Sequence, residues 1–199
     1  IEDAKKREFD LCVIGSGPAG IISALEYASQ CPNEEVVLVE FGSSPTPLRK
    51  SNSLDQSIHV VNKENHHESD ECTDKCLGGT SATWGGRCVM YDEVDFIPRP
   101  LIKNNCTWDL SFYESTKPYI GRACEYFECG RPAFDSVDAG AAMPESIAAG
   151  FIDGNVTDRA LERWSLPTHF GVRYEQNLKD AKNLFLLLGV KAQRMGERH

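Results

Sequence analysis

The chain has 199 residues, of which 41% are hydrophobic and 26% are charged, and its formal net charge is −9. These proportions are typical of a globular protein that is long enough to bury a core. The acidic balance, without a long basic run, argues against nucleic acid and anionic membrane surfaces as partners, because both attract clustered Lys and Arg.

No apolar stretch approaches the roughly 20 residues needed to cross a bilayer. The charged start, Ile1 to Asp10, leads directly into a predicted strand, so we expect no secretory signal. The eight cysteines leave disulfides as an alternative, but Cys12 and Cys88 fall in predicted core or cofactor-loop positions. We therefore expect reduced thiols in a cytoplasmic protein.

The first 40 residues predict one βαβ unit. Phe9 to Ile14 is an apolar run bounded by glycines, which is typical of a buried parallel strand. Pro18 to Gln30 has apolar residues at helical spacing and a proline in the first turn. Val36 to Val39 is a second apolar run, closed by Glu40. A strand, a helix and a strand in this order form one crossover unit.

The sequence Gly15-Ser16-Gly17-Pro18-Ala19-Gly20 joins the first strand to the helix with the spacing G-x-G-x-x-G. Gly15 permits a tight turn, Gly17 lets the backbone approach a pyrophosphate, and Gly20 allows close packing of helix and strand. The start of the helix, at Pro18 and Ala19, offers N–H groups and a positive dipole end to phosphates. This loop predicts a dinucleotide site.

Glu40 ends the second strand, where a carboxylate can accept hydrogen bonds from ribose hydroxyls. Its negative charge disfavours a 2′-phosphate and so argues against NADP. The order of strand, glycines, helix, strand and acidic residue makes this a stronger signal than the glycines alone.

The polar stretch from Gly42 to Cys76 predicts a long loop or insertion. His66, His67, Cys72 and Cys76 could supply four zinc ligands, but their spacing is not that of a zinc finger. We expect a mobile loop and no metal site.

Three further segments follow the insertion. Gly78 to Gly86 is a second glycine-rich stretch, and an aromatic-rich region begins near Pro98. A helical stretch around Tyr174 to Ala181 then precedes an apolar strand, Leu184 to Leu188.

The segment Leu77 to Cys88 resembles the flavin-proximal loop of the glucose–methanol–choline (GMC) oxidoreductases. A second resemblance to this family lies in Arg163 to Gly171 with Tyr174, followed by Asn183 and the apolar strand. The resemblance covers nearly the whole chain except the insertion, and it implies FAD as the cofactor.

The resemblance also implies roles for matching positions. Gly78, Gly79, Thr80 and Ser81 would bring backbone amides and hydroxyls beside the flavin ring and the pyrophosphate. Trp84 and Gly85 would line the flavin face, and Arg87 would lie near the exit of the loop. A strand from Leu186 to Met195 would bring the backbone near Ala192 to the adenine. For Trp84 a plain core position remains an alternative, and for Arg87 a salt bridge does.

Some relatives carry a histidine, in places joined to the flavin, where this chain has Thr83. A threonine has no comparable nucleophilic nitrogen, so we expect noncovalent FAD. The family's catalytic histidine lies in the second half of a longer chain, so we place it beyond this sequence, which then is a fragment or a shortened gene product. His169 is expected to anchor a loop rather than to act as a base, and no catalytic residue is assigned here.

These observations favour an FAD-dependent oxidoreductase that acts on the CH–OH group of an alcohol or sugar, with hydride transfer to flavin N5. The electron acceptor stays open. An NAD-dependent dehydrogenase and a truncated, non-catalytic nucleotide-binding module are the alternatives.

The expected fold class is α/β. We expect a Rossmann-like FAD-binding domain with a doubly wound parallel sheet, and part of a second, α+β substrate domain. The predicted boundaries are residues 1–97 for the first part of the FAD domain, 98–178 for the substrate region and 179–199 for a strand that returns to the FAD domain.

Overall fold

The computed structural model describes residues 7–44, 62, 64–65, 73–98, 108–135, 160–166, 168–194 and 196. The chain divides into two compact units. The first unit combines Ile1–Trp84 with His169–His199, and the second is Gly85–Thr168. The two units meet at residues 84/85 and 168/169, and the helix that begins at Phe170 belongs to the first unit. The boundaries of an FAD domain and a substrate domain at residues 97 and 178 stay a prediction.

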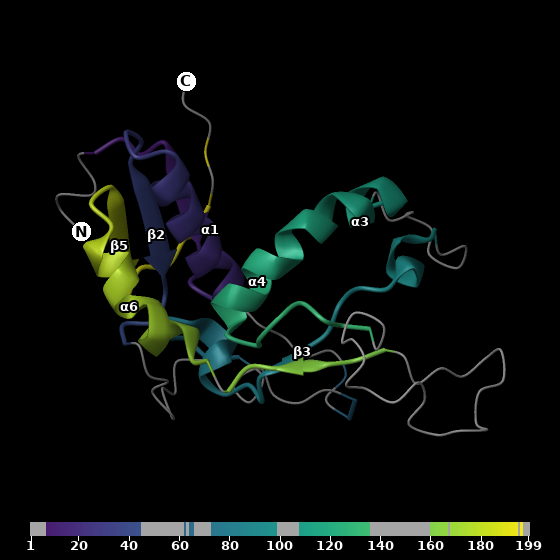
Figure 1. Ribbon diagram of the computed structural model, residues 1–199. Coiled ribbons are helices and arrows are strands. Elements are labelled where there is room, and N and C mark those ends of the chain that lie inside the picture. Colours follow the sequence, from purple (N-terminus) through teal and green to yellow (C-terminus); the bar gives the residue numbers. More distant parts are fainter. Residues whose placement is uncertain are drawn as a thin grey trace, which may run out of the picture. The chain divides into compact units, whose positions relative to one another are not determined.

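The first unit contains a parallel sheet of strands β1 (Leu11–Ile14), β2 (Val36–Glu40) and β5 (Leu184–Leu188), with β2 in the middle. Figure 1 shows β5 beside β2 although about 140 residues of sequence separate them. The predicted βαβ unit and a mixed α/β fold are confirmed. The register aligns Val13 with Leu38, and Leu38 with Leu186.

Within the described part of this unit, the helices α1 (Pro18–Gln30) and α6 (Phe170–Asp180) cover the sheet. Their buried side chains recur every three or four residues, so each helix presents one apolar stripe. The helices contact each other as well as β5, and helices on opposite faces of a sheet could not do so. The expected doubly wound arrangement is therefore not seen among the described residues, where both helices of this unit lie on one face.

The other face of the sheet carries Cys12 and Ile14, and Ile14 is 57% exposed. On the same face, Phe185 of β5 is separated from Cys12 by Val37 of the middle strand and meets Phe9 edge to face, with ring centroids 5.3 Å apart. The Arg7 guanidinium lies over the same Phe185 ring at 4.5 Å. The segment before β1 thus covers part of this face.

The return strand is shorter than expected. It ends at Leu188 rather than continuing to Met195, because Gly189 has φ +71°, a conformation that does not continue a strand. Beyond the strand, Val190 N–H donates to the Glu40 carbonyl at 2.9 Å, so the chain stays beside β2. Ala192 is exposed.

The second unit pairs two short antiparallel strands, β3 (Arg87–Cys88) and β4 (Arg163–Trp164). Its aromatic cluster has Phe96 at the centre of rings from Tyr91, Phe112 and Tyr113, so it includes two residues that precede the expected start of the aromatic-rich region near Pro98. The helices among the described residues of this unit are η3 (Glu93–Phe96), α3 (Leu110–Thr116), η4 (Lys117–Tyr119) and α4 (Ile120–Phe127).

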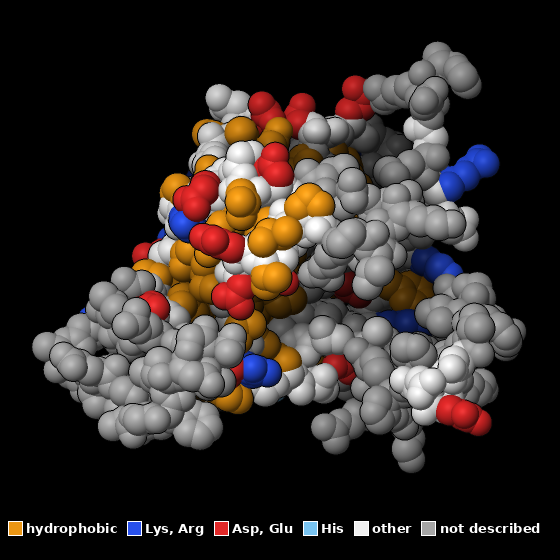
Figure 2. Space-filling model, turned by 90° about the vertical axis from the view of Figure 1, so that its right-hand side faces the viewer, with side chains coloured by type: hydrophobic (Ala, Val, Ile, Leu, Met, Phe, Trp, Pro, Cys, Tyr) orange, Lys and Arg blue, Asp and Glu red, His pale blue; other side chains and the backbone are white. Residues whose placement is uncertain are grey.

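Apolar side chains also reach the surface. On the face shown in Figure 2, hydrophobic side chains lie exposed among acidic ones.

Within the described part of the chain, no helix is long and apolar enough to span a bilayer.

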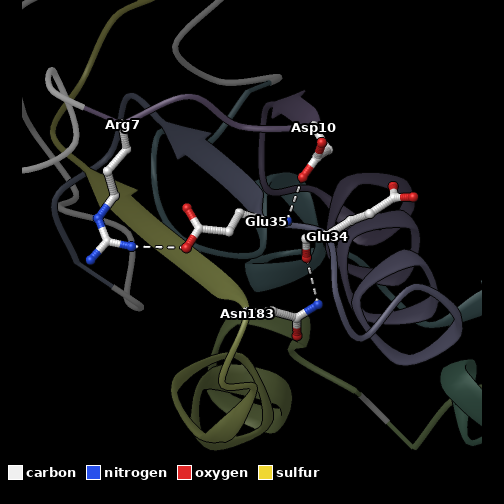
Figure 3. A network of polar contacts seen from close by, with 5 residues as sticks. All are labelled: Arg7, Asp10, Glu34, Glu35 and Asn183. Carbon is white, nitrogen blue, oxygen red and sulfur yellow. Dashed lines mark hydrogen bonds and ion pairs between the residues drawn. The ribbon is translucent and has the colours of Figure 1, made fainter.

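Asn183 ties the end of α1 to the sheet. Its side-chain amide lies within donor distance of three carbonyls, those of Ala28 and Cys31 at 3.1 Å and Glu34 at 2.8 Å. Figure 3 shows this contact beside a second link, in which the Asp10 carboxylate accepts from Glu35 N–H at 2.8 Å. Asn183 therefore fixes the turn that leads from α1 into β2 from across the sheet.

We expect Asn183→Ala to lower the free energy of unfolding by about 1–3 kcal/mol, because three partly buried carbonyls lose their donor. Urea denaturation measures this change. Lys182→Ala, at the exposed neighbouring position, is the control and should stay within about 0.5 kcal/mol. Equal losses in both variants would contradict the role given to Asn183.

Candidate nucleotide-binding site

The first glycine loop has the geometry its spacing predicts. Gly15 has φ +92°, which suits a residue without a side chain. A Cβ on Gly20 would lie 1.9 Å from the Gly15 carbonyl oxygen, so helix and loop approach as closely as backbones can. A Cβ on Gly17 would meet no atom of the protein within 4 Å. Gly15 and Gly20 are thus needed by the fold, whereas Gly17 faces open space.

Helix α1 starts at this open space. Gly17 is its N-cap residue and makes no side-chain hydrogen bond to the helix end. The first N–H groups of a helix have no partner within the helix, and Pro18 contributes none. Ala19 is exposed, and its N–H and that of Gly20 stand at the positive end of the helix dipole.

Glu40 is 7% exposed and lies beneath the loop. Its Oε2 accepts from Ser16 N–H at 2.9 Å and from the Ser16 hydroxyl at 2.7 Å. Its Oε1 accepts from Gly42 N–H at 2.7 Å. A buried carboxylate needs such donors, since desolvation of the charge would otherwise cost several kcal/mol.

Ser16 also joins the first loop to the second. Gly78 N–H donates to the Ser16 carbonyl at 2.9 Å and lies 3.3 Å from its hydroxyl oxygen. A Cβ on Gly79 would lie 3.3 Å from the Gly17 Cα, so the two glycine loops touch. The structure thus brings Gly15, Gly17, Gly78 and Gly79 together.

Ser81 is used inside the protein. It is 2% exposed, and its hydroxyl donates to the Gly78 carbonyl at 2.6 Å and accepts from Phe170 N–H at 3.1 Å. It therefore caps the amino terminus of α6 from a distant part of the chain. Gly171 allows this approach, because a Cβ there would lie 1.8 Å from the Leu77 carbonyl oxygen.

In the first unit, the second glycine loop forms the short helix η2 (Gly79–Ala82), and Thr83 follows it as the C-cap residue. Thr80 is exposed, and its carbonyl accepts from Thr83 and Trp84 N–H groups, each at 3.1 Å. The Thr83 hydroxyl donates to Asp74 at 2.5 Å. Trp84 is half-buried and meets Phe170 edge to face at 6.5 Å.

Two predicted residues, Gly85 and Arg87, belong to the second unit. Arg87 makes a bidentate ion pair with Glu162, with its Nε 2.6 Å from the carboxylate, and this pair raises the pKa of Arg87 and lowers that of Glu162. The structure therefore agrees with the salt-bridge alternative for Arg87. Gly85 is exposed, and a Cβ there would lie 3.9 Å from the Trp164 ring.

The two ends of the polar insertion meet at the site. A Cβ on Gly42 would lie 2.3 Å from the Lys75 carbonyl oxygen, and Leu77 N–H donates to the Ser44 carbonyl at 2.9 Å. The insertion thus leaves and rejoins the first unit at adjacent points.

The alternative zinc site lies largely outside the described residues, since His66, His67 and Cys72 are not among them. Cys76 is described and fully buried, and burial raises the pKa of its thiol to about 11. Nowhere in the described part of the chain do three His, Cys, Asp or Glu residues form a group that could hold a metal.

His169 is the N-cap residue of α6 and is exposed. Its carbonyl accepts from Arg173 N–H at 2.8 Å. The structural roles of Ser16 and Gly171 were not predicted from the sequence. For Gly171 a signal was present, because a glycine in the first turn of a helix lowers helix stability unless close packing requires it.

We expect Glu40→Gln to lower the free energy of unfolding by about 1–3 kcal/mol, because a glutamine amide must turn a donor toward an N–H that needs an acceptor. Urea denaturation of the two proteins tests this. The same substitution at Glu35, whose exposed side chain pairs with Arg7, is the matched control and should cost about 0–1 kcal/mol. Indistinguishable variants would contradict the structural role of Glu40.

Comparisons with known proteins give a limited result. No family model and no curated protein matches the sequence. Among solved structures, a fungal aryl-alcohol oxidase matches with a TM-score of 0.44 and 13% identity, over 92% of this chain and 39% of that one. The chain thus spans well under half the length of that oxidase, and a similarity this low does not assign a family.

Proposed function

We propose that the chain binds FAD noncovalently through its two glycine loops and is the nucleotide-binding part of an oxidoreductase that acts on the CH–OH group of an alcohol or sugar. The observation that carries the proposal is the open space at Gly17, which lies between Gly15, whose φ of +92° favours glycine, and Gly20, where a Cβ would overlap the Gly15 carbonyl oxygen. No neighbouring atom of the protein requires a glycine at position 17, at the start of the helix. A pyrophosphate that closely approaches the backbone there would require one.

The donors at this place suit a phosphate. The N–H groups of Ala19 and Gly20 stand at the amino terminus of α1, and the N-cap residue Gly17 has no side chain to compete for them. A pyrophosphate there would accept from these groups and gain from the helix dipole.

Glu40 is proposed to hold a ribose as well as the loop. A carboxylate offers about four lone-pair positions, and among the described residues three donors lie on that of Glu40. A ribose hydroxyl would use the remaining one, on Oε1. The same charge would repel the 2′-phosphate of NADP.

The second loop is proposed to approach the flavin. Thr80 and Thr83 are exposed there, and neither side chain has the nucleophilic nitrogen that a covalent flavin link would need. When bound, FAD supplies the hydride acceptor of such a reaction. We assign the group that takes the hydroxyl proton to no residue of this chain: the resemblance to the GMC family implies a histidine in the second half of a longer polypeptide, and His169 is proposed to serve the start of α6 through its backbone.

Titration with FAD and with NAD tests the proposal, with flavin fluorescence and calorimetry as readouts. We expect FAD to bind and to be released into solution when the protein is denatured. Binding of NAD alone would favour a nicotinamide-dependent dehydrogenase. FAD bound without reduction by any alcohol or sugar in the full-length protein would favour a non-catalytic module, and binding of neither nucleotide would refute the site.

Gly17→Ala separates binding from folding. Alanine is compatible with the Gly17 backbone at φ −62° and ψ 176°, so the free energy of unfolding should change by less than about 1 kcal/mol. The new methyl group would occupy the space proposed for the pyrophosphate, so FAD affinity should fall by about tenfold or more, or about 1.4 kcal/mol.

The matched comparison is Gly20→Ala, which should destabilise the fold because its Cβ would overlap the Gly15 carbonyl. Thermal unfolding and the FAD titration are measured on both variants. A Gly17→Ala protein that binds FAD as well as the parent would show that the pyrophosphate does not lie there.

A further inference from the structure

The second unit brings three thiols into one cluster, those of Cys88, Cys124 and Cys129. Cys124 and Cys129 are 4% and 5% exposed, and Cys88 is half-buried. All three are free thiols. They do not belong to the proposed nucleotide site, which lies in the first unit.

Cys124 and Cys129 stand at the two ends of a helix cap. Helix α4 ends with Glu128 in the left-handed conformation, φ 49°, and Cys129 N–H donates back to the Cys124 carbonyl at 3.2 Å. This six-residue closure is a Schellman motif, in which the first and last side chains commonly touch. In agreement, the Cys129 Sγ lies 3.8 Å from the Cys124 carbonyl oxygen. Two thiols thus occupy positions where apolar side chains usually meet.

Strand pairing brings Cys88 to the same place. Cys88 is opposite Arg163 in the pair of β3 and β4, and Arg163 Nε donates to the Cys129 carbonyl at 3.1 Å. Gly130 leaves room for that arginine, since a Cβ there would lie 2.7 Å from its Nη2.

The thiols influence one another. The pKa of Cys124 is raised to about 12, first by burial and then by a hydrogen bond with the Cys129 thiol. The pKa of Cys88 is also raised, first by burial and then by the charge of Cys129. Cys129 is therefore the neighbour that the other two share.

We propose that Cys124 and Cys129 are a thiol–disulfide exchange site, which forms an intramolecular disulfide across the cap of α4 by reaction with a low-molecular-weight disulfide such as glutathione disulfide. The cap geometry selects this pair over Cys88 and Cys129, because backbone hydrogen bonds hold Cys124 and Cys129 on the same turn.

The reaction balances in two steps. One cysteine thiolate attacks glutathione disulfide, which breaks the S–S bond, forms a mixed disulfide and releases one glutathione. The second cysteine then attacks the protein sulfur of the mixed disulfide and releases the other glutathione. The two cysteines lose two electrons and two protons, and glutathione disulfide becomes two glutathione thiols.

Burial of the thiols affects how fast the disulfide forms, and not which two cysteines it joins. Only the thiolate attacks, and the raised pKa of Cys124 leaves little thiolate at neutral pH. Disulfide formation should therefore be slow at pH 7 and accelerate as the pH rises to 9, by up to about tenfold per pH unit.

The test equilibrates the full chain with excess glutathione disulfide, blocks the remaining thiols and digests the protein without reduction. Cleavage after glutamate separates the two cysteines, because Glu125 and Glu128 lie between them. We expect the two resulting peptides to stay joined until a reductant is added, as seen by mass spectrometry.

Two results would overturn the proposal. One is that Cys124 and Cys129 remain open to alkylation while the exposed Cys12 becomes glutathionylated. The other is a link from Cys88 to Cys129 in place of the expected pair. Cys129→Ser should abolish the joined peptides and Cys12→Ser should leave them unchanged, and the digest of the unsubstituted chain decides the matter even if a variant fails to fold.

Discussion

The first unit depends on one buried interaction, the carboxylate of Glu40 held by the backbone and hydroxyl of Ser16. A charge in that position is tolerated only because donors surround it, and those donors come from the glycine loop and from Gly42. The interaction therefore fixes the end of β2 against the start of α1. Gly78 adds the second glycine loop to the same point through Ser16.

Close backbone contacts then make this junction rigid. Gly20 packs on Gly15, Gly79 lies against Gly17, and Gly171 lies against Leu77. Side chains would be excluded at Gly20 and Gly171 by the protein itself, so these glycines need no ligand to explain them. Gly17 differs because the protein leaves the space for its side chain empty. Within the motif from Gly15 to Gly20, the fold thus requires some of the glycines, whereas no contact within the protein requires Gly17.

The second unit depends on other contacts. The ion pair between Arg87 and Glu162 lies beside its two-stranded pair, and Arg163 of that pair donates to the carbonyl of Cys129. The exposed position of the ion pair means that it contributes little to stability by itself. The buried thiols of Cys124 and Cys129 lie in the same unit, and it is there that we propose redox chemistry of the protein's own side chains.

The sequence by itself determined the elements with strong local signals. The strand, glycine loop, helix and strand that end at Glu40 lie where periodicity and glycine spacing predict them, and so does the strand Leu184–Leu188, because local patterns determine local structure. Contacts between distant segments depended on the tertiary structure. Only the fold showed that Ser81 caps α6 from a position 89 residues earlier than its partner Phe170, that Arg87 pairs with Glu162, and that the strand stops at Gly189. Each of these outcomes depends on which backbone atoms come within hydrogen-bonding distance, and residue types along the chain do not specify that distance.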